Sequence, residues 1–459
     1  MKNSLLVSEL RQFLATNDVH HLQDFCVTNH PGDVADAISA LEPEEIRAIL
    51  MHIEPRLRVD IFSHLNDALQ LDVAETLNRR ELVRLIADMS PDDRVDLFKH
   101  IPEERRERIL PGLAQAERED IRRLAAYPEG TAGAVMTSEY ALLQPGLTVT
   151  AAIDKLRSEA PDKEIIYYAY VVDMNRILIG FISLKDLILA SPGERIEDIM
   201  HRDVISCRAS DDQEHAARLI AKYDLLALPV VNGQNVLVGI ITHDDAIDVI
   251  HQEHTEDMEK FMAIGGSHET GTYMQTSSWE HFKSRIGWLV VLALLGLVSG
   301  YIVHRYEALL LQFAIFATFM PMLADTGGNT GSQSATLVVR ALAIGEIAYQ
   351  DILKVLWKEF KVAIPLAVFL AGLAYARVIF FSGNSKIPTG YPLWLIGLAI
   401  GIALGLQVAT ATLIGALLPL AAARLKLDPA VVASPALTTV VDITGLLIFF
   451  STAKWLLGI

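Results

Sequence analysis

The 459-residue chain contains only two cysteines, Cys26 and Cys207, which lie far apart and do not have metal-ligand spacing. This scarcity excludes a disulfide framework and gives no indication of a zinc site. The first 14 residues lack a continuous apolar segment and include Glu9 and Arg11. We therefore expect no secretory signal and a cytoplasmic N-terminal half.

Long apolar segments are also missing from the first half of the chain, although the mean hydropathy of the whole is +0.32 and the net charge is −17. From residue 286 to the end, 10 Lys and Arg accompany 7 Asp and Glu, which leaves 29 bases and 49 acids for the earlier part. This asymmetry predicts an acidic soluble module joined to a membrane module. It argues against nucleic acid as a partner, because phosphates attract basic surfaces.

Residues 1–132 contain short amphipathic stretches that begin with proline and acidic residues, as at 42–45, 90–93 and 101–104. Proline is tolerated in the first turn of a helix, and carboxylates there face the positive end of the helix dipole. The pattern predicts a domain made of stacked short helices.

Residues 133–250 repeat one pattern twice, in copies at 133–198 and 199–250. Two apolar strand segments around Val171 and Gly180 recur 59 positions later around Val230 and Gly239. Each copy ends in Ser/Thr-x-x-Asp. This duplication resembles a tandem pair of cystathionine-β-synthase (CBS) domains.

An acidic helix and linker at 244–278 precede the apolar part of the chain, 279–459. Five segments there are long enough to span a bilayer, which takes about 20 residues. We place them at 286–303, 309–341, 362–381, 393–422 and 431–457. Basic residues concentrate in the loops on the side of the N-terminus, so that side is expected to be cytoplasmic.

Asp442 lies in the middle of the last expected span. A carboxylate at the bilayer centre costs roughly 2.5 to 3.5 kcal/mol and usually faces a bundle interior or a watery path. We interpret it as the ion-binding residue of a pore; a protonated Asp442 bonded to a neighbouring helix is the alternative. The second span carries a small and polar run, where glycines allow close packing or local unwinding. The further pore-lining candidates are Asp325, Asn329, Gln333, Ser434 and Thr438.

The acidic helix carries seven carboxylates against a single base, Lys260. Like charges at i, i+3 and i+4 spacing repel each other. The pattern indicates either a solvated face or a latch that a cation neutralises, and its position before the membrane segments favours the latch.

These features together resemble the MgtE family of magnesium transporters over essentially the whole chain. The most specific matches are residues 327–336, with sequence GGNTGSQSAT, and residues 441–448, with sequence VDITGLLI. The expected fold is a multidomain α plus α/β membrane protein: a cytoplasmic helical superhelix domain, a tandem CBS pair, a connecting plug helix and a five-helix transmembrane domain.

The resemblance implies a homodimer in the cell inner membrane whose pore binds hydrated Mg²⁺ at Asp442 of both subunits, and which cytoplasmic Mg²⁺ closes. It also implies ATP binding between the CBS copies, with Tyr168 and Asp186 at the matching positions. The regulatory metal positions that match are Asp92, Asp96, Asp212, Glu214, Asp224, Asp245, Asp248, Glu253, Glu256, Asp257 and Asp428.

Two other functions remain possible on the sequence alone. A CBS-regulated transporter could carry Co²⁺ or Mn²⁺, although the expected spans lack His and Cys, which favours Mg²⁺ over softer metals. The Asp-Thr-Gly string at Asp325 could instead pair with Asp442 in an intramembrane aspartyl protease, because such enzymes use two carboxylates that share a proton.

Overall fold

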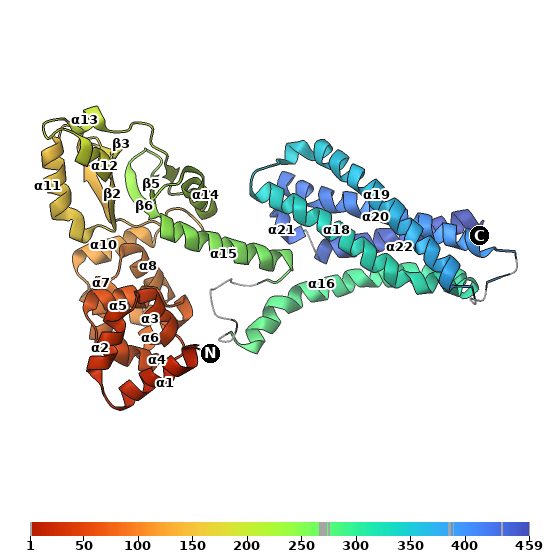
Figure 1. The fold of residues 1–459 in the computed structure, drawn as a ribbon, viewed down its shortest axis with the longest axis horizontal. Helices are drawn as coiled ribbons and strands as arrows, with labels where there is room; N and C mark the ends of the chain where they lie inside the picture. The colour runs from red at the N-terminus through yellow and green to blue at the C-terminus, as the bar shows by residue number, and fades with distance from the viewer. Residues whose placement is uncertain are drawn as a thin grey trace. The chain divides into compact units, whose positions relative to one another are not determined.

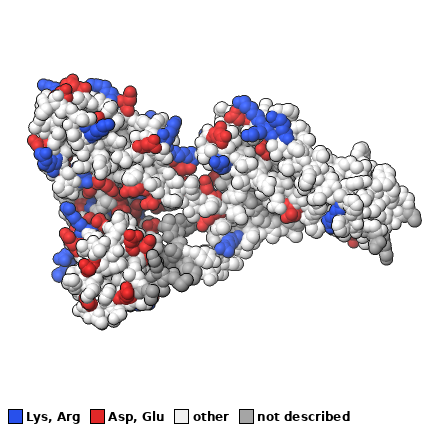
Figure 2. All heavy atoms as spheres, viewed as in Figure 1, with Lys and Arg blue, Asp and Glu red and all other residues white. Residues whose placement is uncertain are grey.

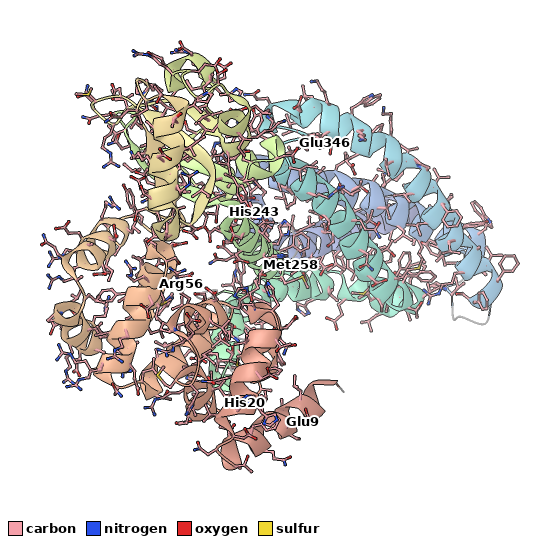
Figure 3. All side chains as sticks on the ribbon, turned by 60° about the vertical axis from the view of Figure 1, so that its left-hand side comes forward. Glu9, His20, Arg56, His243, Met258 and Glu346 are labelled. Carbon is pink, nitrogen blue, oxygen red and sulfur yellow. The ribbon has the colours of Figure 1, made fainter. Side chains whose placement is uncertain are left out.

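The computed structural model describes residues 2–265, 273, 276–383, 387–388, 390–432 and 435–458. Apart from the linker, the chain forms two compact units, one up to Glu253 and one from His254 onward. Helix α15, His243–Phe261, belongs to both, and Figure 3 labels His243 at its start and Met258 near its end. Each unit is described by itself below.

The first unit begins with ten short helices, as the sequence predicts (Figure 1). Pro43, Pro55 and Pro91 each stand in the first turn of a helix, where the missing N–H would have no partner. The helices are α1 (Lys2–Ala15), α2 (Val19–Thr28), α3 (Pro31–Ile38), α4 (Pro43–Leu50), α5 (Pro55–Ser63), α6 (Asp67–Thr76), α7 (Arg79–Asp88), α8 (Pro91–His100), α9 (Glu103–Ile109) with the 3-10 turn η1 (Leu110–Gly112), and α10 (Gln115–Leu124).

The buried side chain of Arg94 fixes α8 against the end of α7. Its guanidinium donates hydrogen bonds to the carbonyl oxygens of Ile86 at 2.8 Å and Met89 at 2.6 Å. Only 5 % of Arg94 is exposed. The start of α8, which carries Asp92 and Asp93, is therefore held in a defined place.

The predicted duplication is confirmed as two three-stranded sheets, each with one parallel and one antiparallel strand pair. Val171 lies opposite Gly180 in the first sheet, and Val230 lies opposite Gly239 in the second, so the register repeats with the 59-residue offset. The first copy contains β1 (Tyr140–Leu143), α11 (Val149–Glu159), η2 (Ala160–Asp162), β2 (Ile165–Val172), β3 (Leu178–Ser183), α12 (Leu184–Leu189) and α13 (Ile196–Ile199). The second contains β4 (Cys207–Arg208), α14 (Gln213–Tyr223), β5 (Ala227–Val231) and β6 (Leu237–Thr242).

The two copies exchange their leading segments. Thr137, before the first sheet, forms two backbone hydrogen bonds with Ile240 of the second copy, at 2.8 and 3.0 Å. His201, before the second sheet, forms the same pair of bonds with Phe181 of the first copy, at 2.8 and 2.9 Å. A side chain at Gly239 or at Gly180 would collide with the methionine that precedes each of these segments.

The second unit consists mainly of long apolar helices. Among the described residues, four helices are long and apolar enough to cross a membrane by length and composition: α16 (Ser278–Arg305), α19 (Ile352–Phe381, extended by the turn η4, Tyr349–Asp351), α20 (Leu393–Arg424) and α22 (Pro435–Leu457). The more polar α18 (Met320–Ala343) is a fifth long helix and packs against α20 and α22.

One expected span is interrupted in the structure. The segment expected at 309–341 is divided into α17 (Glu307–Gln312), η3 (Ala314–Phe319) and α18. The bulky Phe313, Phe316 and Phe319 are buried around this break, and a proline stands in the first turn of α18. The last expected span, 431–457, corresponds to α21 (Pro429–Val432) and α22 (Pro435–Leu457), which lie on either side of two residues outside the described ranges.

Candidate functional site

Asp442 occupies the middle of α22, with Val441 buried on one side of it and Gly445 one turn later. Its Oδ1 atom is buried and has no hydrogen-bond partner among the described residues. A buried carboxylate oxygen without a partner is costly, so it requires a proton, a cation or water to satisfy it. This atom is the strongest indication of an ion site in the second unit.

The polar run of α18 forms a continuous helix, so its glycines serve packing and not unwinding. Asp325 and Asn329 are exposed one turn apart, and Asn329 Nδ2 donates a hydrogen bond of 3.0 Å to Asp325 Oδ1. Gln333, one further turn along, is exposed on the same face, while Thr438 on α22 is half-buried. Ser434, the other expected pore-lining residue, lies outside the described residues.

Gln407 on α20 is a buried polar residue that the sequence analysis did not single out. Only 1 % of it is exposed, and its Nε2 donates a 3.0 Å hydrogen bond to the Leu323 carbonyl. A Cβ at Gly327 of α18 or at Gly445 of α22 would overlap its amide. Gln407 therefore packs between the two helices that carry the pore candidates.

The C-terminal end of α15 is attached to the second unit by a basic side chain. Lys260 Nζ lies 2.6 Å from Glu256 Oε1 and 3.1 Å from Asp428 Oδ2. Partial burial disfavours the charged ammonium, but the hydrogen bonds to Glu256 and Asp428 outweigh it and raise the pKa of Lys260 to about 12. Two of the expected metal ligands thus share an ammonium group in this structure.

Phe261, the last residue of α15, packs against a small apolar cluster formed by Ala335, Ala411, Leu437 and Val441. These residues come from α18, α20 and α22, and Val441 directly precedes Asp442. The end of α15 therefore contacts the same helices that surround the pore candidate.

A second candidate site lies within the first unit, where acidic side chains gather (Figure 2). Asp92 is 6 % exposed, and its Oδ1 is buried without a hydrogen-bond partner among the described residues. Burial, followed by the charges of Glu164 and Asp245, raises the pKa of Asp92 well above its usual range. Asp93, next to it, accepts a 2.6 Å hydrogen bond from Ser63 Oγ.

Burial is also the main cause of the raised pKa values around Asp92. It raises the pKa of Asp245 to about 8 and that of Glu164 to about 7, and repulsion from neighbouring carboxylates adds to both. The pKa of Asp96 rises to about 6 for the same main reason, and that of Asp248 also rises. Asp96, Glu164 and Asp248 remain accessible to solvent, so water screens them more than it screens Asp92.

The structure brings Asp92, Asp96, Asp245 and Asp248 into one acidic region and adds Glu164, which the sequence analysis missed. Glu164 is an acid in the short segment between η2 and β2, so no periodic pattern in the sequence marks it as a site residue. No group of three or more His, Cys, Asp or Glu side chains in the described part of the chain has the geometry to hold a metal ion directly. Mg²⁺ usually keeps several of its waters, so a water-mediated contact is compatible with this spacing.

The other expected regulatory residues have local partners of their own. Asp212 caps the start of α14 by accepting from the Glu214 backbone N–H, and the Glu214 side chain forms an ion pair with Arg218. Asp224 ends α14 with a left-handed backbone, φ 52°. On α15, Glu253 accepts a 2.7 Å hydrogen bond from Gln213 Nε2, and Asp257 is half-buried.

The two residues expected to contact ATP are both in the first repeat. Asp186 accepts hydrogen bonds from Ser183 and His201; burial opposes its ionisation, but these bonds outweigh burial and lower its pKa. Tyr168 is half-buried, and its ring packs edge-on against Phe181.

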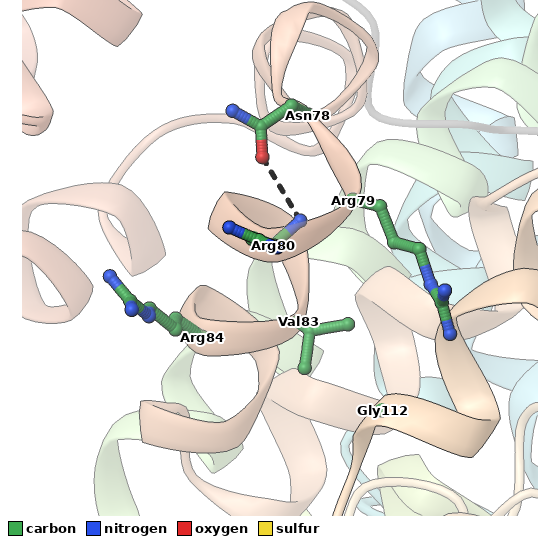
Figure 4. Close-up of a pocket in the computed structure, with 6 residues that line it drawn as sticks. All are labelled: Asn78, Arg79, Arg80, Val83, Arg84 and Gly112. Atoms are coloured by element: carbon green, nitrogen blue, oxygen red, sulfur yellow. Dashed lines mark hydrogen bonds between the residues drawn. The ribbon is translucent and has the colours of Figure 1, made fainter.

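A pocket of about 540 Å³ in the helical domain is basic, in contrast to the acidic region around Asp92 (Figure 4). Its lining includes Arg79, Arg80 and Arg84 but no acid, and Asn78 Oδ1 accepts a hydrogen bond from the Arg80 backbone N–H. Three guanidinium groups repel a divalent cation, so this pocket is not part of a Mg²⁺ site.

Models of three families match this chain in sequence order. The MgtE intracellular N domain matches residues 29–130, the CBS domain matches residues 132–193 and 196–252, and a family described as divalent cation transporter matches residues 320–452.

Two solved structures resemble the first part of the chain. The soluble part of a magnesium transporter is 31 % identical, with a TM-score of 0.51, and covers 55 % of this chain and 99 % of its own. The cytosolic domain of the Mg²⁺ channel MgtE in complex with ATP is 36 % identical, with a TM-score of 0.50, and covers 53 % of this chain and 99 % of its own.

Whole-chain relatives agree with these matches. The magnesium transporter MgtE of Thermus thermophilus is 40 % identical over 351 residues, 76 % of this chain and 75 % of the relative. That of Bacillus subtilis is 36 % identical over 365 residues, 80 % of this chain and 78 % of the relative. These relatives are named as transporters, which indicates a non-enzymatic function in place of the protease alternative. The chain, with its helical domain, paired repeats and apolar helices, belongs to the MgtE family of magnesium transporters.

Proposed function

We propose that this chain carries Mg²⁺ into the cell across the inner membrane through a pore formed between two copies of itself, with Asp442 of both copies contacting the hydrated ion. The observation that carries this proposal is the buried Asp442 Oδ1, which has no hydrogen-bond partner among the described residues. Mg²⁺ dehydrates reluctantly and is commonly bound through one or two carboxylates plus water. Two aspartates around a dimer axis supply that ligand set.

The exposed polar face of α18 supports the same pore. Asp325, Asn329 and Gln333 follow one another at one-turn intervals and offer oxygen atoms to the waters around an ion. The Gln407 amide lies between α18 and α22, in the space where a Cβ atom at Gly327 or at Gly445 would stand. It therefore fixes the separation of the two helices. A fixed spacing lets the site distinguish a hydrated ion by size.

Closure of the pore depends on α15. Phe261 rests on the cluster that includes Val441, and Lys260 holds the end of the helix to Asp428. In this arrangement α15 opposes the separation of α18, α20 and α22. Movement of α15 away from them opens the path.

Internal Mg²⁺ favours the closed form by neutralising the acidic region of the cytoplasmic unit. Burial is the main cause of the raised pKa values of Asp92 and Asp245, and repulsion from the Glu164 carboxylate adds to it when these groups are ionised. A cation between them stabilises the compact arrangement in preference to the separated one, which is the condition for a ligand to shift an equilibrium. ATP modulates the same unit by binding near Tyr168 and Asp186.

The test is Mg²⁺ uptake into vesicles that contain a fluorescent Mg²⁺ indicator, with Asp442→Asn as the pore variant. The substitution keeps the shape of the side chain and removes its charge, so we expect uptake to fall at least tenfold. Glu346→Gln is the matched control, since it removes an exposed charge just after α18 from a residue that is not among the pore candidates. Normal uptake by Asp442→Asn would reject the pore assignment.

The same vesicles test the regulation and the cargo. We expect the double variant Asp92→Asn and Asp245→Asn to import Mg²⁺ at internal concentrations that stop the unmodified chain. Competition with Co²⁺ and Mn²⁺ identifies the transported ion. Transport of either ion in preference to Mg²⁺ would show that Mg²⁺ is not the cargo, but it would not contradict the assignment of Asp442 to the pore.

A further inference from the structure

An apolar groove of about 440 Å³ lies between α19 and α20, outside the pore candidates. Its exposed lining includes Leu353, 79 % exposed, and Trp357, 61 % exposed. The complete lining is Leu353, Leu356, Trp357, Phe360, Leu413, Ile414 and Leu417.

The length of α19 places this groove at the edge of the membrane. The helix has 30 residues and a spanning helix needs about 20, so roughly ten residues extend beyond the hydrocarbon core. From Val362 to Phe381 the helix is apolar except for Arg377, and this part therefore occupies the core. Residues 352–361 then lie in the headgroup region, where tryptophan is also favoured.

A stripe of lysines runs beside the apolar lining on the same helix. Leu353, Trp357 and Phe360 form one stripe at i, i+4 and i+7, and Lys354, Lys358 and Lys361 form the next, shifted by one residue. Figure 2 shows basic side chains gathered where α19 begins. An aliphatic surface thus borders a positively charged one along the first three turns.

Two of these lysines are available to an anion. Lys354 pairs with Asp351 at 2.8 Å, whereas Lys358 and Lys361 are exposed and have no carboxylate within 4 Å in the described ranges. Lys361 lies 6.0 Å from the Trp357 ring centroid, which joins the basic stripe to the groove. The neighbouring Glu359 accepts a 2.8 Å hydrogen bond from the buried Ser334 and so is directed toward α18.

We propose that this groove binds an anionic phospholipid, with the phosphate at Lys358 and Lys361 and one acyl chain entering the hydrocarbon core between Phe360 and Leu413, at the end of the groove nearest the core. A phosphate complements the two ammonium groups, whereas a second copy of the same face, paired by twofold symmetry, would place lysines against lysines. Basic pockets between membrane helices on one side of the bilayer are recognised sites for acidic headgroups. The site does not depend on which ion the chain transports.

The test uses Trp357 as a reporter in bilayers of phosphatidylcholine that contain brominated phosphatidylglycerol or brominated phosphatidylcholine. Trp279, Trp288, Trp394 and Trp455 are replaced by Phe, and retained Mg²⁺ uptake shows that this variant is folded. We expect the anionic lipid to quench Trp357 at much lower mole fractions. Lys358→Gln and Lys361→Gln should each reduce that preference about fivefold, the factor for one basic residue at an anionic surface.

Two controls separate charge from general damage. Lys358→Arg with Lys361→Arg should keep the preference, and Lys454→Gln, at the end of another span, should not change it. A second measurement, native mass spectrometry of the unmodified chain, should show bound phosphatidylglycerol that the double Gln variant lacks. Equal quenching by both lipids would overturn the proposal, and quenching by neither would show that protein covers the groove.

Discussion

Lys260 Nζ lies 3.1 Å from Asp428 Oδ2, so an ammonium group attaches the end of α15 to the segment before α21. The same ammonium contacts Glu256, and both acids were expected to bind regulatory Mg²⁺. In this structure a side chain of the protein supplies the positive charge that the acidic helix needs at this end. In the proposed latch, Lys260 would therefore neutralise part of the acidic charge without Mg²⁺.

Replacing Lys260 with Gln should weaken closure. Glu256 and Asp428 would then face each other without a counter-charge, so more internal Mg²⁺ is needed to hold α15. Partly exposed ion pairs contribute up to about 1 kcal/mol, which corresponds to an increase of about fivefold in the internal Mg²⁺ concentration that halves uptake. Graded internal Mg²⁺ in vesicles measures this value.

The control is Lys222→Gln on α14, which removes a lysine whose ammonium lies over the Tyr223 ring. The folded pKa of Lys260, about 12, is above its ordinary value of 10.5, so the contact is fully present below pH 10.5 and is lost only as the pH rises through 12. A Lys260 contribution that changed between pH 6 and pH 9 would contradict this ion pair.

Binding of Mg²⁺ to the cytoplasmic acids should release protons near neutral pH. Asp245 and Glu164 have raised pKa values of about 8 and 7 in the compact arrangement, so that form holds more protons than the separated one between about pH 4 and 8. Without Mg²⁺, the compact form is therefore favoured by acid and loses this advantage as the pH rises toward 8. Calorimetric titration at pH 7 in buffers with different ionisation enthalpies measures the released protons.

The variants Asp245→Asn and Glu164→Gln should each reduce this proton release. Asp173→Asn, in the turn between β2 and β3, is a control, since its carboxylate accepts hydrogen bonds from the nearby backbone N–H groups of Asn175 and Ile177. Identical heats in all buffers would show that these carboxyl groups are already ionised before Mg²⁺ binds.

Gly445→Ala should destabilise the membrane helices, because the added Cβ would overlap the Gln407 amide. Overpacking a buried site typically costs about 1 to 3 kcal/mol. Thermal unfolding in detergent should show a lower midpoint and the vesicle assay a lower uptake. Gly372→Ala on α19 is the matched change, since a Cβ there meets nothing within 4 Å.

A double variant identifies the cause. Gln407→Ala removes the overlapping amide, so Gly445→Ala should be less harmful in that background than in the unmodified chain. Equal effects in the two backgrounds would mean that Gln407 does not determine the packing at Gly445.

Gly180→Ala should destabilise the paired repeats, because its Cβ would lie 2.9 Å from both the His201 carbonyl oxygen and Met200 Sδ. We expect a loss of about 1 to 3 kcal/mol, measured by scanning calorimetry of the whole chain. Gly146→Ala, at a position where a Cβ meets nothing within 4 Å, should be nearly neutral. Similar unfolding temperatures for the two variants would contradict the close contact at Gly180.

Much of the fold could be predicted because its signals are local. Pro43 and Pro91 mark helix starts by their own backbone restriction, and the 59-residue offset fixes two equivalent strand pairs. The strands β1 and β4 were missed because they have only 4 and 2 residues, too few to show an alternating pattern.

The site was less predictable because it depends on residues that meet only in three dimensions. Glu164 matters because its charge acts on Asp92 and Asp245, which are far from it in sequence. Gln407 did carry a signal, since a lone amide within the apolar α20 must find a partner inside the membrane. Lys260 was visible as the single base of an acidic helix, but its contact with Asp428 could not be read from spacing.

The exchanged leading segments of the two repeats bear on how the cytoplasmic unit folds. Thr137 completes the edge of the second sheet and His201 completes that of the first, so neither repeat retains its full set of backbone partners when the other unfolds. The pair should therefore melt in one cooperative step, and a chain shortened by one repeat would lose both sheets. A displacement of one copy therefore moves the other as well, so the duplicated region should move as one rigid body.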